Sequence, residues 1–315
     1  MKRRDFLTAA TALPLAGLLP MRAAFADGKV LRIGYQKYGT LVLLKEKGTL
    51  EGALEPLGVS VTWSEFPGGP QLLEALNVGA IDFGTAGEAP PIFAQAAGAP
   101  LIYVGYEPPA PKGEAILVPK DSPLKTVAEL KGKKVALNKG SNVHYLLVRA
   151  LENAGLSVKD IQPVYLPPAD ARAAFEQGSV DAWVIWDPFL AAASAATGAR
   201  TLSDGENLVS NHQFFLAERG FATGNPKVVD AVLQQLVAID AWAKGDPKGA
   251  AAVLSPKVGI PADVLEVALA RQGYGVAPLT PEVVAEQQKI ADTFHALGLL
   301  PKPINVSDAV IKLGS

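Results

Sequence analysis

The chain lacks cysteine entirely, and its two methionines, Met1 and Met21, lie near its N-terminus. Without cysteine the protein has no disulfide and no acylated N-terminal cysteine, and a zinc site has few ligands to use. Hydrophobic residues make up 49% of the chain, and methionine is an ordinary choice for filling gaps in a core. Its absence after Met21 indicates selection against sulfur, as in an abundant protein made when sulfur is scarce. Chance in an alanine-rich composition is the alternative.

The sequence also lacks the usual signatures of an enzyme. It contains no G-x-S-x-G elbow, no Walker loop and no G-x-G-x-x-G turn. Its three histidines, His144, His212 and His295, are far apart in the sequence, so we expect no catalytic residues, no metal and no cofactor. His144 lies close to a candidate binding loop described below, but a structural role within a helix is the more common one for such a residue.

The first 26 residues have the features of an export signal. A basic head that contains the pair Arg3-Arg4 precedes an apolar run over residues 6–20, and an A-x-A cleavage site ends at Ala26. The arginine pair resembles the twin-arginine type of signal, whose passengers cross the membrane folded. We therefore expect cleavage after Ala26 and a free periplasmic protein.

The remaining 289 residues carry 25 basic and 30 acidic side chains. This length is sufficient for two domains. A slightly acidic surface argues against binding nucleic acid or an anionic membrane surface. No run after the signal reaches the roughly 18 consecutive apolar residues of a membrane-spanning helix, so we expect no membrane insertion.

Short β-rich runs alternate with helical patterns, which predicts an α/β fold with mostly parallel sheets. In the first half we expect strands at 30–35, 59–66, 81–85 and 101–106 and helices at 40–47, 70–78 and 90–97. In the second set we expect strands at 115–118, 134–137, 163–166 and 180–186 and helices at 143–153, 169–177 and 189–196. The C-terminal part is mainly helical, with helices expected at 227–244, 247–254, 262–271 and 281–297.

Two breaks in this alternation divide the chain into two lobes. We expect lobe 1 to contain residues 27–107 and 217–315, and lobe 2 to contain residues 113–210. Residues 108–112 and 211–216 would then be hinge crossovers between the lobes.

The two halves also resemble each other. Residues 75–82 align with residues 174–181, and the alignment continues through Glu88 and Asp187 to Gly98 and Gly198. Although any α/β unit has this general pattern, the shared Gly-x-[Ile/Val]-Asp favours a duplicated lobe. Ligands of open α/β sheets bind beyond the carboxyl ends of the strands, so two facing lobes predict a single cleft between them.

Five segments resemble one known family: 33–40, 65–76, 87–91, 137–145 and 186–188. They are similar to the aliphatic sulfonate-binding proteins of ABC importers, which are relatives of the taurine- and nitrate-binding proteins. The similarity extends over nearly the whole chain after the signal, and K-G-S-N-V-H-Y (139–145) and W-D-P (186–188) are its most specific parts.

The resemblance implies the type II periplasmic binding protein fold, in which each lobe is a mixed sheet flanked by helices and the ligand binds between the lobes. It also implies a monomer that delivers an aliphatic sulfonate to a membrane permease and its ATPase, for use as a sulfur source. The absence of sulfur after the signal agrees with this role.

A sulfonate is ionised at every biological pH, so it needs several hydrogen-bond donors, which helix N-termini provide. The backbone N–H groups of Ser141, Asn142 and Val143 follow a strand and begin a helix, as Gly39-Thr40 and Gly87-Glu88 do elsewhere. We expect these junctions to face the ligand. The alternative is that such residues are ordinary N-caps.

Three side chains complete the expected site. Gln36 and Tyr38 follow the first strand and donate hydrogen bonds, and Trp186 ends an apolar strand where it would cover the alkyl tail. Surface exposure is the alternative for Gln36 and Tyr38, and core packing is the alternative for Trp186. For Trp183, core packing is the favoured interpretation.

Glu88 and Asp187 are included as residues next to the site, because a carboxylate beside a sulfonate repels it. They would instead cap helices, join the lobes through a cation, or face the amine of a taurine-like ligand.

Two other functions stay open. In the first, the protein binds taurine, a sulfate ester or another small anion. The resemblance separates these ligands from sulfonates poorly, because the shape of the pocket decides which tail fits. A biosynthetic enzyme on the same scaffold would need a metal or a histidine pair, which the chain does not offer.

Overall fold

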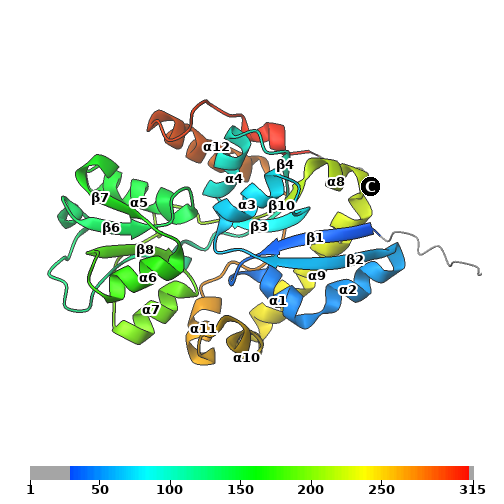
Figure 1. Cartoon of the computed structure of the whole chain (residues 1–315), viewed down its shortest axis with the longest axis horizontal. Helices are drawn as coiled ribbons and strands as arrows, with labels where there is room; N and C mark the ends of the chain where they lie inside the picture. Colours follow the sequence, from blue (N-terminus) through cyan, green and yellow to red (C-terminus); the bar gives the residue numbers. More distant parts are fainter. Residues whose placement is uncertain (1–28, 312–315) are drawn as a thin grey trace, which may run out of the picture.

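The computed structural model describes residues 29–311, which form two α/β lobes side by side (Figure 1). The predicted export signal and its twin-arginine pair lie outside the described residues. Each lobe is built on a five-stranded sheet covered by helices on both faces. Among residues 29–311, no helix combines the length and the apolar character needed to cross a membrane.

The sheet of lobe 1 has the strand order β2-β1-β3-β10-β4, with β10 antiparallel to its neighbours. Its strands are β1 (Lys29–Tyr35), β2 (Val59–Glu65), β3 (Phe83–Gly87), β4 (Leu101–Glu107) and β10 (Gln213–Glu218). The helices from the first part of the chain are α1 (Thr40–Lys47), α2 (Thr49–Leu54), α3 (Gly69–Asn77) and α4 (Ala89–Ala96). The C-terminal helices are α8 (Arg219–Gly224), α9 (Pro226–Gly245), α10 (Pro247–Val258), α11 (Ala262–Leu269) and α12 (Pro281–Ala296).

The sheet of lobe 2 has the order β7-β6-β8-β5-β9, with β5 antiparallel to its neighbours. Its strands are β5 (Glu114–Val118), β6 (Lys134–Leu137), β7 (Gln162–Tyr165), β8 (Ala182–Trp186) and β9 (Arg200–Asp204). Its helices are α5 (Asn142–Asn153), α6 (Pro168–Glu176) and α7 (Phe189–Thr197). Short 3-10 helices occupy Glu55–Leu57, Pro111–Gly113, Val127–Leu130, Val158–Asp160 and Val306–Ala309.

The repeated aspartates have the same structural role in both lobes. Asp82 exchanges hydrogen bonds with the backbone of Arg32 in β1: its N–H donates to the Arg32 carbonyl (2.7 Å), and its carboxylate accepts from the Arg32 N–H (2.9 Å). Asp181 makes the same two contacts with Lys134 in β6, both at 2.8 Å. Since the two sheets also share one strand order, the predicted resemblance between the halves has a structural basis.

The expected elements are present with small shifts, and three short ones were not expected: α2, α8 and β9. Residues 213–216, which the sequence assigns to a crossover, belong to β10 and pair with β3 and β4. A short apolar run has no period that distinguishes a central strand from a crossing segment. Helix α10 continues to Val258 although the sequence predicts an end at 254, because Pro256 lies in its last turn and removes few helical hydrogen bonds.

Apolar residues pack on both faces of the lobe 1 sheet and in the interior of lobe 2. The lobes are in contact on two sides of their junction. Tyr145 of α5 belongs to a cluster of lobe 1, with its ring centroid 5.7 Å from that of Phe294 in α12. On the other side, Ala192 of α7 packs into the lobe 1 cluster that includes Leu265 and Leu269 of α11. The structure therefore has its two lobes closed against each other.

Candidate functional site

A small cavity of about 10 Å³ lies at the junction of the lobes. Lobe 1 contributes residues that follow β1, end β3, or lie at the start of α3, α4 and β10: Gln36, Tyr38, Gly69, Gly87, Pro90 and Gln213. Lobe 2 contributes Ser141, Asn142 and Trp186. The carboxyl ends of β1, β3 and β8 all lead into this cavity, as expected for a ligand site of facing α/β sheets.

Three helices begin at the cavity wall. Helix α3 begins at Gly69, α4 has Pro90 in its first turn, and α5 begins at Asn142 after its N-cap Ser141. None of the three has a side-chain hydrogen bond that caps its N-terminus. The first backbone N–H groups of a helix have no partner within the helix. Because proline has no N–H, Pro90 and Pro91 leave α4 few such donors and Pro70 removes one from α3, whereas the first turn of α5 contains no proline. The free donors therefore come mainly from α5, and the dipoles of all three helices favour an anion at this point.

Among the described α-helices, three have a side chain that caps the N-terminus. Glu218 accepts from two N–H groups of α8, Asp246 accepts from the N–H of Gly249 in α10, and Thr280 accepts from the N–H of Val283 in α12. Helices α1, α2, α6, α7, α9 and α11 also lack a side-chain cap. What distinguishes α3, α4 and α5 is therefore that their N-termini meet at one cavity, where the helix dipoles favour an anion.

The loop before α5 is held in place by its own hydrogen bonds. The Ser141 hydroxyl donates to the Asn138 carbonyl (2.7 Å), and the Gly140 N–H donates to Nδ1 of His144 (3.3 Å). Burial, assisted by the charge of Lys139, lowers the pKa of His144 to about 4. His144 is therefore a neutral acceptor that positions the loop, and it does not line the cavity.

Asn142 connects lobe 2 to the hinge and to lobe 1. Its side-chain amide donates to Glu114 Oε2 (2.6 Å) and to Asn211 Oδ1 (2.9 Å). Asn211 in turn donates to the carbonyl of Ala110 in the other crossover (2.8 Å). The side chain of Asn142 also faces Gly87, where an added Cβ would lie 2.9 Å from the Asn142 Cγ. Only a glycine at position 87 permits this close approach.

Three residues that the sequence analysis selected by their side chains also line the cavity: Gln36, Tyr38 and Trp186. Gln36 donates one amide hydrogen to the Thr85 carbonyl (3.0 Å). Tyr38 comes from lobe 1 but packs against the apolar cluster of lobe 2, and burial raises its pKa, so its hydroxyl remains a donor. Trp186 lines the cavity, whereas Trp183 lies in the core.

A second, larger groove of about 200 Å³ shares Gln36, Tyr38 and Trp186 with the cavity. The remaining lining comes from both lobes and is mostly apolar: Lys37, Glu65, Phe66, Pro67, Pro167, Pro168, Ala169 and Phe189. The groove therefore extends from the enclosed cavity as a passage with largely apolar walls.

Thr40 is directed away from the cavity. Its hydroxyl lies 2.6 Å from a carboxyl oxygen of Glu107 and 2.6 Å from one of Asp240, and it accepts from Gln272 Nε2 (3.0 Å). Burial raises the pKa of both carboxyl groups, and for Glu107 the charge of Asp240 adds to the effect. The hydroxyl is thus used inside lobe 1. Its neighbour Gly39 also lies outside the cavity, with a left-handed φ of 79°.

The side chain of Val143, like that of Thr40, does not line the cavity. The side chain is fully buried in the core of lobe 2, so only its backbone N–H, in the first turn of α5, remains available at this junction.

The two carboxylates that the sequence placed beside the site do not line the cavity either. Glu88 is fully buried and accepts from the His212 N–H (3.1 Å). Burial raises the pKa of Glu88 to about 8, and burial together with the charge of Glu88 raises the pKa of Glu114 well above its ordinary value. Both groups are therefore protonated near neutral pH, which removes most of their repulsion of a nearby anion.

Asp187 forms an ion pair between the lobes. Its Oδ1 accepts from Nη2 of Arg271 (3.0 Å), and its Oδ2 lies 2.9 Å from Nε of the same guanidinium. Asp187 follows β8 of lobe 2, whereas Arg271 follows α11 of lobe 1. Burial raises the pKa of Asp187 to about 6, and Arg271 opposes this effect. Two of the three roles considered for Asp187 are present in the structure: it pairs with a cation from the opposite lobe, and its Oδ1 accepts from the N–H of Ala191 in the first turn of α7 (3.1 Å).

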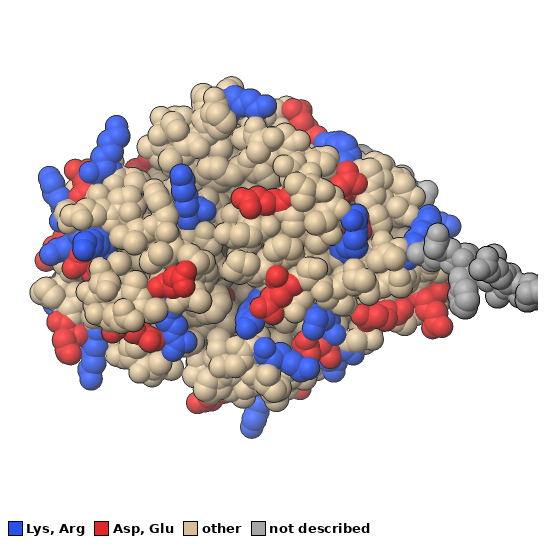
Figure 2. Space-filling model, viewed as in Figure 1, with Lys and Arg blue, Asp and Glu red and all other residues tan. Residues whose placement is uncertain are grey.

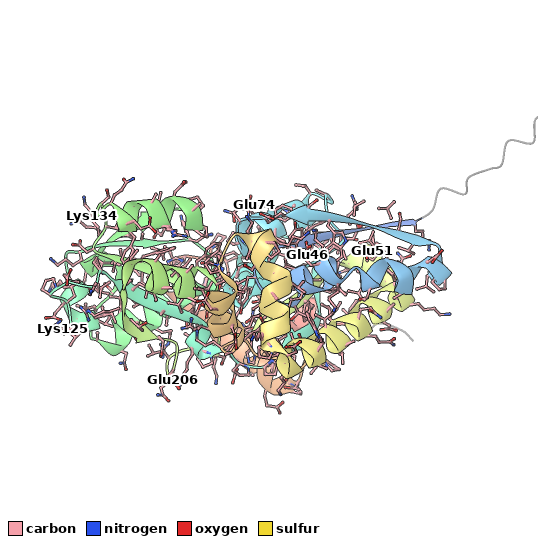
Figure 3. All side chains as sticks on the ribbon, turned by 90° about the horizontal axis from the view of Figure 1, so that it is seen from below. Glu46, Glu51, Glu74, Lys125, Lys134 and Glu206 are labelled. Atoms are coloured by element: carbon pink, nitrogen blue, oxygen red, sulfur yellow. The ribbon has the colours of Figure 1, made fainter. Side chains whose placement is uncertain are left out.

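No lysine or arginine is among the residues that line the cavity. Basic and acidic side chains are mixed over the visible surface of both lobes (Figure 2), and Lys125 and Lys134 lie at the end of lobe 2 remote from lobe 1 (Figure 3). Among the described residues, no group of three histidine, aspartate or glutamate side chains is arranged to hold a metal ion. The cavity is consequently suited to an anion held by amide groups.

Comparisons with known proteins agree with this geometry. Residues 29–255 match the model of the NMT1-like family. The chain belongs to this family. Within the family it is 49% identical over 304 residues to an aliphatic sulfonates-binding protein of Escherichia coli (strain K12), with 95% of each chain covered. It is 35% identical to a protein of the same description from Bacillus subtilis (strain 168), covering 90% of this chain and 86% of the relative.

A solved structure shows the same fold in a family member. The alkanesulfonate-binding protein SsuA from Xanthomonas axonopodis pv. citri, bound to MOPS, has a TM-score of 0.87 at 49% identity and covers 91% of this chain and 99% of its own. The predicted two-lobe fold and the resemblance to the sulfonate-binding proteins are thereby confirmed. These NMT1-like relatives are binding proteins, which supports the prediction that the chain is not an enzyme.

Several residues at the site were not predicted from the sequence. Gly69, Pro90 and Gln213 line the cavity, and Arg271 joins the lobes. Gly69 precedes a proline at the start of an expected helix, which is the same signal that identified the Ser141 junction. No sequence pattern pointed to Arg271, because its partner Asp187 is 84 residues away in the sequence.

Proposed function

We propose that this protein binds an aliphatic sulfonate in the cavity between its lobes and delivers it to a membrane permease with its ATPase. The relatives at 49% and 35% identity are aliphatic sulfonates-binding proteins, which supports this ligand class. We further propose that the mature chain begins after Ala26, resides in the periplasm and acts as a monomer. The selection against sulfur in the mature sequence fits a protein used when sulfur is scarce.

The observation that carries the proposal is that the N-termini of α3, α4 and α5 meet at one cavity whose lining includes no basic side chain. A sulfonate has three equivalent oxygens and a charge that protonation does not remove. Backbone N–H groups at a helix N-terminus supply donors in a fixed arrangement, and the helix dipole favours a negative charge there. In this proposal Ser141, Asn142 and Val143 contribute through their amide groups, while Gln36 and Tyr38 add side-chain donors.

The apolar groove supports a ligand with an extended organic tail. Its walls include Phe66, Pro67 and Phe189, and Tyr38 and Trp186 connect it to the cavity. The carboxylate that lines it, Glu65, is exposed and lies 3.7 Å from Lys37. A ligand with a terminal amine, such as taurine, therefore finds no free buried carboxylate. We propose that alkanesulfonates with tails of several carbons, or with a ring, are preferred over taurine.

Isothermal titration calorimetry of residues 27–315 tests the proposal. The ligand series consists of methanesulfonate, ethanesulfonate, hexanesulfonate, MOPS, taurine, sulfate and nitrate. We expect binding of the organic sulfonates, with affinity rising from methanesulfonate to hexanesulfonate by roughly tenfold for every two buried methylene groups. Tighter binding of taurine, sulfate or nitrate would assign the protein to another ligand, and no heat with any sulfonate would reject the proposal.

A further inference from the structure

The ion pair between Asp187 and Arg271 joins the lobes next to the cavity. Asp187 directly follows Trp186, which forms part of the cavity wall, and the Asp187 side chain is 1% exposed. Arg271 reaches it from lobe 1, and the two side chains meet at 2.9 and 3.0 Å. A buried charge of this kind is tolerated only with a partner of opposite charge.

Each member of the pair is fixed to its own lobe. The Asp187 N–H donates to the Gly113 carbonyl at the start of β5 (2.9 Å), and Asp187 Oδ1 also accepts from the Ala191 N–H of α7 (3.1 Å). On the other side, the residue after Arg271, Gln272, donates to Thr40 of lobe 1 (3.0 Å). The pair therefore transmits a displacement of one lobe directly to the other.

The pair lies at one end of an apolar seam between α7 and α11. Leu265 and Leu269 of α11 pack in the same cluster as Ala192 of α7. Apolar contact favours closure but has little directional preference. The hydrogen bond from Arg271 Nη2 to Asp187 Oδ1, together with the attraction of the two opposite charges, adds a directed contact between the lobes. The ion pair therefore supplies the geometry that the seam lacks.

The other ionisable groups near Asp187 do not replace Arg271. Tyr38 is close enough for the charges of Asp187, Glu107 and Glu114 to raise its pKa. Among the described residues, Arg271 is the charged side chain that acts on the pKa of Asp187, and Tyr38, whose pKa is raised mainly by burial, carries no charge that could replace it.

We propose that Arg271 is a positioning residue of the binding site, which holds Asp187 and the adjoining Trp186 wall in the closed arrangement. The inference rests on the proposed function for its ligand, but its structural part concerns closure itself. The anion is then bound by amide groups, while the basic side chain acts on the protein and not on the ligand.

Four variants test this: Arg271→Gln, Arg271→Lys, Asp187→Asn and the double variant Asp187→Asn/Arg271→Gln. Removing only the arginine leaves a buried carboxylate without a partner, so we expect hexanesulfonate affinity to fall on the order of 100-fold. Arg271→Lys keeps the charge and should recover most of the affinity. The double variant should bind more tightly than Arg271→Gln, because it leaves no unpaired charge.

The pH profile distinguishes positioning through Asp187 from a general structural defect. Without Arg271, the pKa of Asp187 rises further, because two of the three effects that oppose the rise come from Arg271 and only the hydrogen bond from the Ala191 amide remains. Closure of Arg271→Gln then becomes less favourable as pH rises from 6 to 8, since the carboxyl group ionises without a partner. We expect its affinity to fall over this range and the double variant to show no such decrease.

Lobe separation provides a readout that does not need a ligand. The chain contains no cysteine, so Ser64→Cys and Asp170→Cys give specific spin-label sites at two exposed positions near the groove, one on each lobe. We expect Arg271→Gln to lengthen the distance between the labels, and Arg271→Lys to leave it near the unsubstituted value. Failure of all sulfonates to bind would reject the proposed function only. Unchanged distances in Arg271→Gln, or additive losses in the double variant, would overturn the inference.

Discussion

Gly87→Ala should weaken ligand binding without unfolding the protein. A Cβ at this position would lie 2.9 Å from both Cγ and Oδ1 of Asn142 and 3.1 Å from its Cβ. These three atoms belong to lobe 2, whereas Gly87 ends a strand of lobe 1. The added methyl group therefore acts mainly against closure of the lobes and much less against the folding of either lobe.

The expected magnitude follows from the cost of overpacking. Contacts of this kind cost roughly 1–3 kcal/mol, which corresponds to a loss of affinity of about 5- to 150-fold. Calorimetry with hexanesulfonate measures the loss, and thermal unfolding without ligand should give a midpoint close to that of the unsubstituted protein. Gly52→Ala is the matched control, because a Cβ at that exposed position in α2 meets no atom within 4 Å.

A second substitution checks that Asn142 is the cause. In Gly87→Ala/Asn142→Ala two of the three crowded atoms are absent, so the pair should be strongly non-additive. The reasoning is refuted if Gly87→Ala binds within twofold of the unsubstituted protein. In that case the ligand-bound state does not bring Asn142 against Gly87.

Three further predictions concern other parts of the molecule. Burial raises the pKa of Glu88 from 4.5 to about 8, so between these pH values the folded protein keeps a proton that the unfolded chain releases, and the free energy of unfolding falls as pH rises. Denaturant unfolding at pH 5 and pH 8 should show a decrease on the order of 4 kcal/mol that is absent in Glu88→Gln. The same decrease in both proteins would contradict this. Asp82→Ala loses an ion pair as well as the backbone contact, so it should lower the free energy of unfolding by about 2 kcal/mol, against about 1 kcal/mol for Asp181→Ala. Equal losses in denaturant unfolding would show that the ion pair adds nothing. Trp186→Ala should lower the affinity for hexanesulfonate more than that for methanesulfonate, by about 1–2 kcal/mol, and equal losses would place the tail elsewhere.

The duplicated lobes show how far local pattern determines this fold. Asp82 and Asp181 each follow a Gly-x-[Ile/Val] pattern, and each makes the same backbone contacts in its own lobe. Alternating strands and helices have periods of about two and 3.6 residues, so most elements were placed within two residues of their bounds. The exceptions were short, as in β9, where a five-residue strand has little period to detect.

The sequence by itself determined where a strand is followed by a helix, and these junctions include Gly87, Ser141 and Asn142 of the cavity wall. Such junctions are local, because a few neighbouring residues set the backbone conformation. Only the tertiary structure decided which junctions face the cavity: Thr40 begins a helix in the same way, yet its hydroxyl is held by Glu107 and Asp240. The closed structure also decided the partner of Asp187, because a contact between lobes depends on their packing and leaves no periodic trace in the chain.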